Sequence, residues 1–162
     1  MGMLGTVINA LAIQNALEKI SIPTRVLSSI PIPAVCESYI RRRAINHLEK
    51  NIVIIFAAGT GNPYFTTDTA AALRASEVSA SIILKGTKVD GVYSSDPKKN
   101  KKAKRYKTIK YSKILANNLK IMDGSAIALA RDNNIPIIVF PINKKNAFLN
   151  AIFNKGQYTI IK

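Results

Sequence analysis

The sequence predicts an α/β fold built on a mainly parallel sheet, and two observations lead to this expectation. Short apolar runs rich in β-branched residues alternate along the chain with segments whose apolar residues recur at helical spacing. Within residues 51–58, the uninterrupted run from Ile52 to Phe56 is typical of a strand buried on both faces of a parallel sheet. In such folds ligands bind at the carboxyl ends of the strands, so the loops after strands are the first places to search for a site.

The other elements follow from the same two periodicities. Leu4, Val7, Ile8 and Leu11 lie at helical spacing and predict a first helix over residues 3–19. Further helices are expected at 37–50, 69–77, 112–118, 123–133 and 146–154, and further strands at 24–28, 81–85, 136–140 and, as an edge strand, 158–161. Asp90-Gly91 is a turn signal between short β segments within residues 89–93, and residues 98–110 are expected to form a basic loop.

Length and composition bound the class of protein. The 162 residues, 48% of them hydrophobic, suit one globular domain over residues 1–162. The single Cys36 excludes a disulfide framework, and neither a membrane-spanning apolar run nor a signal peptide is expected, so we predict a cytoplasmic protein without a membrane partner. The net charge of +15 attracts polyanions in general. It is consistent with a nucleic-acid binder, with an enzyme whose ligands carry phosphate groups, or with a coding bias toward lysine.

The loop at residues 57–68 carries the strongest local signal for chemistry. It leaves a predicted buried strand and enters a predicted helix, and it contains Gly59-Thr60-Gly61-Asn62. Glycines there can take positive φ and present backbone N–H groups to an anion. From these residues alone, a phosphate site and a purely structural turn are about equally supported, and an aromatic at Tyr64 or Phe65 is either a base-stacking or a packing residue.

A second candidate lies after the next strand. Lys85 is expected to end that strand and to point into the crevice, where an ammonium group could stabilise a phosphoryl group in transfer. Tyr93 and Asp96 could border a nucleotide, although turns at Asp90-Gly91 and Asp96-Pro97 explain half of these residues without any ligand.

At these positions the chain resembles the bacterial uridylate kinases, a branch of the amino acid kinase superfamily. The resemblance rests mainly on Ala58 to Asp68 and on Lys85 to Tyr93, and it extends over the whole chain. Further matches lie at Met1 to Leu4, Asp96-Pro97, Tyr111-Ser112, Leu119 to Asp123 and Ala130 to Asp132. It implies a three-layer α/β/α fold with a mainly parallel sheet, and transfer of the γ-phosphoryl group of ATP, with Mg²⁺, to UMP. It also implies a homo-oligomer, a hexamer in this family.

The resemblance also assigns residue roles. Lys85 would neutralise the transferring phosphoryl group and Asp68 would organise the site. Thr87, Tyr93 and Asp96 would contact ATP, and no residue is assigned as a metal ligand. The UMP site would be lined by Thr60, Gly61, Asn62, Pro63, Tyr64, Phe65, Thr66 and Thr67, with Thr60 and Asn62 nearest the phosphate.

Compared with the family pattern, the chain lacks the Lys-and-Gly loop, the Gly-rich turn and the Gly-Asp-His that precede the helix opening this sequence. We therefore interpret it as truncated at the N-terminus and predict little or no activity for this chain alone. The alternative is a non-catalytic basic fragment that binds nucleotides or nucleic acid through residues 98–110, although no specific nucleic-acid signature is present. Carbamate or acetylglutamate kinase chemistry is a second alternative, which the loop at 60–68 disfavours.

Overall fold

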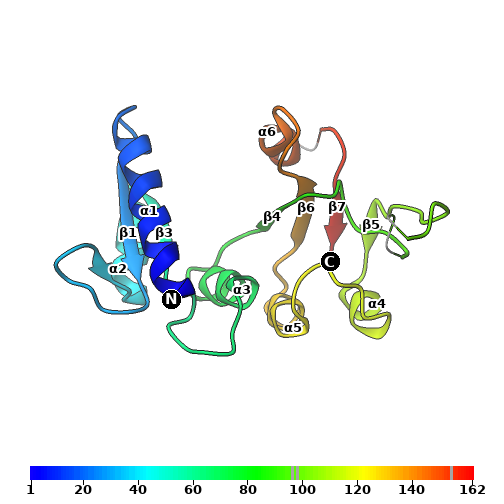
Figure 1. The fold of residues 1–162 in the computed structure, drawn as a ribbon, viewed down its shortest axis with the longest axis horizontal. Coiled ribbons are helices and arrows are strands. Elements are labelled where there is room, and N and C mark those ends of the chain that lie inside the picture. Colours follow the sequence, from blue (N-terminus) through cyan, green and yellow to red (C-terminus); the bar gives the residue numbers. More distant parts are fainter. Residues whose placement is uncertain (96, 98, 154) are drawn as a thin grey trace. The chain divides into compact units, whose positions relative to one another are not determined.

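The computed structural model describes residues 1–95, 97, 99–153 and 155–162 (Figure 1). The chain forms two compact units, unit 1 from Met1 to Val78 and unit 2 from Ser79 to Lys162. Each unit has its own sheet, and the two units are described separately below.

Unit 1 is built on a three-stranded parallel sheet in the order β2-β1-β3, from β1 (Thr24–Ser28), β2 (Glu37–Ser38) and β3 (Val53–Ala57). The β1 strand lies where it was predicted, and Val26 is in register with Ile55 of β3. The prediction that β3 is buried on both faces was wrong, because Val53 is exposed and the next three residues are only half-buried. Since all three strands run the same way, the loops after β1 and β3 leave the sheet at one edge.

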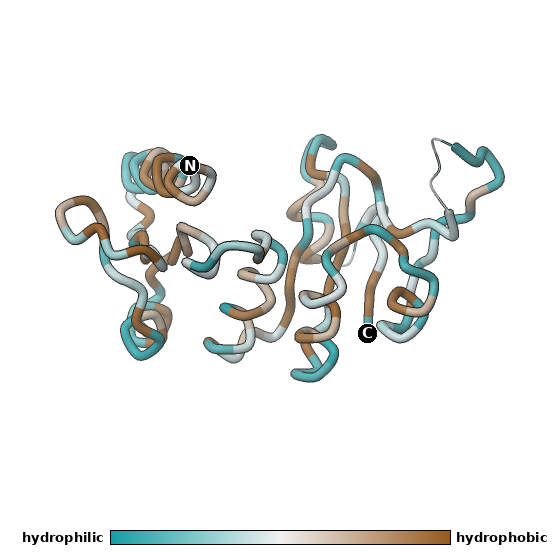
Figure 2. The backbone as a smooth tube through the Cα atoms, turned by 60° about the horizontal axis from the view of Figure 1, so that its bottom comes forward, coloured by the Kyte–Doolittle hydropathy of each residue, from teal (hydrophilic) through white to brown (hydrophobic). Residues whose placement is uncertain are grey.

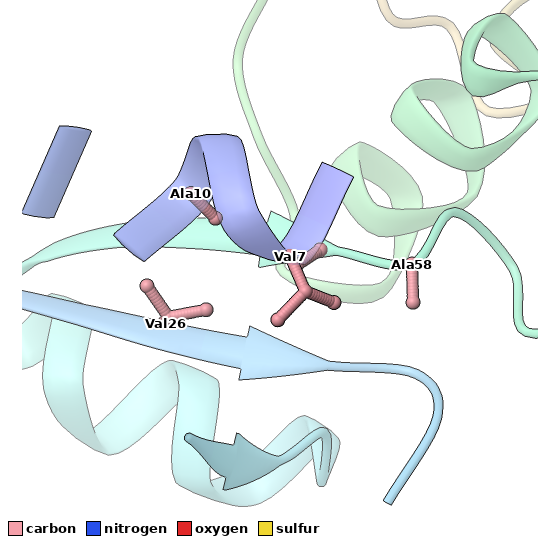
Figure 3. Close-up of a cluster of buried hydrophobic side chains, with 5 residues drawn as sticks. Val7, Ala10, Val26 and Ala58 are labelled. Atoms are coloured by element: carbon pink, nitrogen blue, oxygen red, sulfur yellow. The ribbon is translucent and has the colours of Figure 1, made fainter. Parts of the chain in front are cut away.

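The helices of unit 1 are α1 (Gly2–Glu18), α2 (Arg41–Glu49) and α3 (Thr67–Glu77). Val7 and Ala10 of α1 pack on Val26 of β1 and on Ala57 and Ala58 at the end of β3 (Figure 3). The helix predicted at 37–50 begins only at Arg41. Residues 37 and 38 instead pair with β1 as a short strand, an arrangement that apolar periodicity does not reveal.

Unit 2 is built on a four-stranded sheet in the order β4-β6-β7-β5. The strands are β4 (Ile83–Thr87), β5 (Thr108–Ile109), β6 (Ile137–Pro141) and β7 (Thr159–Ile161), and only the β6–β7 pair is antiparallel. The prediction of β7 as an edge strand was wrong, because β5, a strand that was not predicted inside the basic loop, pairs with its outer side. All five residues of β6 are buried, as expected for the third apolar run.

The helices of unit 2 are α4 (Tyr111–Ala116), α5 (Gly124–Asp132) and α6 (Ala147–Ile152). Ala147 and Ala151 of α6 pack on Ile138 and Phe140 of β6. The helix predicted at 146–154 ends at Ile152, and Asn154 lies outside the described residues.

Helices alternating with mainly parallel strands confirm the predicted fold class. Figure 2 shows hydrophobic residues along the strands of both units, whereas the described part of the lysine-rich segment between Tyr93 and β5 is mostly hydrophilic. Within the described residues, no helix is both long enough and apolar enough to cross a membrane.

Tyr111 ties the start of α4 to the segment before β6. Its side chain is buried, and its hydroxyl donates a hydrogen bond to the carbonyl of Ile135 at 2.5 Å. Burial raises the pKa of the Tyr111 phenol above its ordinary value of 10.0 because the neutral form is favoured in the core. The neutral Tyr111 phenol therefore makes its full contribution to folding stability below about pH 10. This contribution is lost as the pH rises through the pKa of Tyr111 in the folded state.

We predict that Tyr111→Phe lowers the free energy of unfolding by about 1–2 kcal/mol at pH 7, because the carbonyl of Ile135 loses its partner. The difference from wild type should shrink above about pH 10, where ionisation of Tyr111 destabilises the wild type alone. Urea unfolding at pH 7 and above pH 10 measures both values, with Tyr64→Phe, at a fully exposed position, as the control. A gap that stays constant with pH would contradict this account.

Candidate functional site

The loop between β3 and α3 has an unusual backbone. Ala58, Gly59, Gly61 and Tyr64 have φ values of 62°, 59°, 80° and 68°, in the left-handed region. For Ala58 and Tyr64 this conformation is strained by about 1–2 kcal/mol each, so other contacts must hold it. At Gly61 a side chain would also collide, because a Cβ there would lie 3.0 Å from the carbonyl oxygen of Ser29.

Two hydroxyl groups hold the first turn of this loop. The backbone N–H of Ala58 donates to Oγ1 of Thr6 in α1 at 2.8 Å. Oγ of Ser29, just after β1, donates to the carbonyl of Gly59 at 2.7 Å. Neither Thr6 nor Ser29 was among the predicted site residues, because nothing in their local sequence marks them; only the register of β1 against β3 brings Ser29 to this loop.

The middle of the loop is closed on itself and open to solvent. Oγ1 of Thr60 accepts from the backbone N–H of Asn62 at 3.2 Å, and Nδ2 of Asn62 donates to the carbonyl of Thr60 at 3.4 Å. Tyr64 is fully exposed and Phe65 is 57% exposed. Residues 62–67 are all exposed, so Tyr64 and Phe65 are not packing anchors, which was one of the two interpretations of these aromatics.

The loop ends on a capped helix. Oγ1 of Thr66 accepts from the backbone N–H groups of Asp68 and Thr69 at 3.2 and 3.5 Å, and Asp68 lies in the first turn of α3. The N–H groups of this first turn and the helix dipole create a positive potential at the end of the loop. A glycine loop leading into a helix N-terminus is an arrangement suited to binding a phosphate group.

In unit 2, Lys85 lies in the middle of β4, in register with Val139 of β6. The prediction that it ends its strand was wrong, because pairing with β6 continues through Gly86 to Thr87. The side chain of Lys85 is half-buried. Thr87 is the last strand residue, and its Oγ1 donates to the carbonyl of Val89 at 2.6 Å and starts the following loop.

The loop after β4 is held by residues distant in the sequence. The Tyr93 hydroxyl donates to Oδ1 of Asp90 at 2.7 Å, and this hydrogen bond, more than burial, raises the pKa of Tyr93. Oγ1 of the buried Thr159 accepts from the N–H of Val92 at 2.9 Å. Nη1 of Arg105 donates to the carbonyl of Tyr158 at 2.9 Å.

The short β segments predicted on either side of Asp90-Gly91 do not pair with each other. Residues 88–91 are bends, and Tyr93 makes a single antiparallel bridge with Arg105. Asp96, the third residue predicted to contact ATP, lies outside the described residues.

The predicted site residues therefore divide between the units. Unit 1 carries the whole loop from Thr60 to Asp68, and unit 2 carries Lys85, Thr87 and Tyr93. A hollow of about 470 Å³ in unit 1 is lined by residues of α1, β1, the segment 33–38 and α2, and by none of the predicted site residues.

Comparison with known proteins identifies the relatives of this chain. The model of the amino acid kinase family matches residues 1–141. A uridylate kinase of Paramagnetospirillum magneticum is 60% identical over 161 residues, which cover 99% of this chain and 67% of that protein. A uridylate kinase of Anaplasma marginale is 59% identical, with 99% and 66% covered. The chain thus spans about two thirds of the length of these curated relatives.

Solved structures show the same similarity. The crystal structure of UMP kinase from Ureaplasma parvum has a TM-score of 0.95 and 46% identity, covering 99% of this chain and 68% of that one. Uridylate kinase from Archaeoglobus fulgidus has a TM-score of 0.62 and 27% identity, covering 91% of this chain and 66% of that one.

We predict that alanine substitutions at the loop glycines lower the free energy of unfolding more where there is less space for the added methyl group. Gly59→Ala should cost about 1–2 kcal/mol of unfolding free energy, since only its φ of 59° opposes a side chain and nothing lies within 4 Å. Gly61→Ala should cost at least about 1 kcal/mol more, because its Cβ also meets the Ser29 carbonyl. Urea unfolding measures both.

Gly5→Ala in α1 is the matched control, since it lies in a helix with open space around it and should stabilise by about 0.5–1 kcal/mol. Equal costs at Gly59 and Gly61 would show that the loop does not keep this conformation in solution.

Proposed function

Because the chain belongs to the amino acid kinase family, and its closely similar relatives are uridylate kinases, we propose that it takes part in transfer of the γ-phosphoryl group of ATP to UMP, giving UDP and ADP. This would place it in pyrimidine nucleotide biosynthesis. The single observation that carries the proposal is the loop from Gly59 to Thr67, a half-buried glycine turn whose exposed second half enters the capped N-terminus of α3.

In this proposal the loop binds UMP. The phosphate of UMP is a dianion that suits backbone N–H groups and a helix N-terminus, and Thr60 and Asn62 lie where the loop turns. The exposed rings of Tyr64 and Phe65 offer flat apolar surface to a base. Gly61, Pro63, Thr66 and Thr67 complete the proposed UMP site.

In the same proposal, the remaining site residues bind ATP or act in the transfer step. Phosphoryl transfer needs mainly positioning and positive charge, so it requires no nucleophilic side chain from the protein. Lys85 would neutralise charge on the transferring phosphoryl group, and Asp68 would organise the groups around it. Thr87, Tyr93 and Asp96 would contact ATP.

Mg²⁺ would enter with ATP. The described residues contain no group of three His, Cys, Asp or Glu side chains able to hold a metal ion. A donor set with isolated carboxylates fits Mg²⁺, which is commonly bound through one or two carboxylates, substrate phosphates and water. When bound, the ion would neutralise phosphate charge.

We also propose that the protein is a cytosolic homo-oligomer, a hexamer as the family resemblance implies. Leu4, Ile8 and Ile13 of α1 are 49%, 69% and 50% exposed and offer apolar surface for a subunit contact. Light scattering during size-exclusion chromatography tests the oligomeric state.

We predict that the 162-residue chain binds UMP and that Asn62→Ala weakens this binding about three- to tenfold, the effect of losing a hydrogen bond that orders the loop. Asn9→Ala, at an exposed position of α1, is the matched control and should leave affinity unchanged. Isothermal titration calorimetry with UMP measures both. Absence of UMP binding by the folded wild-type chain would refute the proposed function.

We further predict that this chain alone phosphorylates UMP at least a thousandfold more slowly than a full-length relative. It spans about two thirds of such relatives, and each charge-stabilising contact missing from a transition state costs about 10²–10³ in rate. A coupled assay of UMP-dependent ADP release checks this, with Lys85→Met as the background. A rate near that of the full-length relative would contradict it.

A further inference from the structure

Arg74 is an arginine whose side chain is almost completely buried. It lies near the end of α3 and is 7% exposed, and within the described ranges it is the only charged residue in the buried class. Burying a guanidinium group away from water is costly unless its hydrogen bonds are made inside the protein. Its contacts therefore indicate what this residue does.

One side of the guanidinium group is occupied by an ion pair and an aromatic ring. Nη1 lies 2.6 Å from Oε2 of Glu77, one helical turn further along α3. The group also stacks on Tyr39, with 3.6 Å between Cζ and the ring centroid, and the Tyr39 hydroxyl donates to the same carboxylate oxygen. Glu77 and Tyr39 together fix the plane of the guanidinium group.

The other end of the guanidinium group reaches the candidate site. Nη2 of Arg74 donates to Oγ of Ser29 at 2.8 Å, and the same hydroxyl donates to the carbonyl of Gly59 at 2.7 Å. Because Oγ of Ser29 accepts from Arg74, its single proton is directed at Gly59. A series of hydrogen bonds thus runs from Glu77 through Arg74 and Ser29 to the first glycine of the loop.

The geometry of a peptide bond carries this restraint into the loop. The Gly59–Thr60 unit is planar and trans, so holding the carbonyl of Gly59 also sets the direction of the Thr60 N–H, which points the opposite way, away from Ser29. That N–H is one of the groups that would face a bound phosphate. Gly59 can adopt other φ values without strain, so its φ of 59° needs contacts such as this hydrogen bond to hold it.

We propose that Arg74 is a positioning residue for the substrate loop: acting through the Ser29 hydroxyl, it fixes the Gly59–Thr60 peptide unit in the orientation that receives the phosphate of the nucleoside monophosphate. The identity of the ligand rests on the proposed function above. The restraint on the loop does not, because all four residues and the loop lie in unit 1.

Two variants remove the restraint in different ways. Arg74→Lys keeps the positive charge, but a lysine ammonium lacks the planar, forked guanidinium group that donates to Glu77 and Ser29 at the same time. Ser29→Ala removes the link to Gly59 and leaves the Arg74–Glu77 pair intact. Their matched controls are Arg43→Lys, at an exposed pair with Glu37, and Ser76→Ala, whose hydroxyl donates within α3.

The experiment measures three quantities on the folded 162-residue chain: amide hydrogen exchange of residues 59–62, the dissociation constant for UMP, and the melting temperature. For both variants we expect exchange of these amides to rise several-fold and the dissociation constant to increase about three- to tenfold, while both controls stay at wild-type values. Ser29→Ala should give these changes with little loss of melting temperature.

Each of the other outcomes also supports or overturns the positioning role. A purely structural ion pair would make Arg74→Lys melt earlier while loop exchange and UMP affinity remain unchanged, and this would overturn the proposal. If Arg74→Lys does not fold, Ser29→Ala alone decides. If the wild-type chain binds no UMP, the proposed function fails, and the exchange of residues 59–62 in Ser29→Ala still confirms or overturns the positioning role.

Discussion

The backbone turn at the end of β3 is the constraint on which the candidate site depends. Ala58 is completely buried and has a left-handed φ, so the chain leaves the sheet in a direction that an L-residue disfavours. The strain is offset by two hydroxyl groups from elements that precede β3, Thr6 on α1 and Ser29 after β1. The packing of α1 and the register of β1 against β3 therefore determine where the glycine loop points.

In unit 2 the loop after β4 is held by contacts of a different kind. This loop has no helix N-terminus at its end and is held from the side, by Thr159 on β7 and by Arg105. A Cβ on Gly91 would lie 2.5 Å from Oγ1 of Thr159, so the loop passes very close to β7. In both units, then, the loop that follows a parallel strand is held by hydroxyl groups from other parts of the same unit.

The apolar runs made much of the fold predictable. The strands at β1 and β6, and the helices α1, α3 and α5, follow from periodicity because burial of their apolar faces decides their structure. Two of the errors lie where pairing between backbones decides the structure instead. Glu37 and Ser38 form a strand because they meet the edge of β1, and Lys85 lies inside its strand because β6 pairs beyond it.

The glycine loop and its helix cap were recognisable because Gly, Thr and Asn at these spacings have direct backbone consequences. The residues that hold the loop were not recognisable in the same way. Arg74 and Glu77 have the spacing of an ordinary exposed i,i+3 pair, and only the tertiary structure buries the arginine against Tyr39 and Ser29. A role that depends on contacts between distant residues leaves no local pattern.

The distances along the chain between these contacts have a consequence for biosynthesis. The contacts that shape the loop of unit 1 span 30 and 52 residues, and all of their partners have been synthesised by the time α3 is complete. The contact between Val92 and Thr159 spans 67 residues, so the loop of unit 2 lacks this restraint until β7 has been made. Closing such a long loop costs more chain entropy and is slower. As the chain emerges from the ribosome, the first loop can mature well before the second.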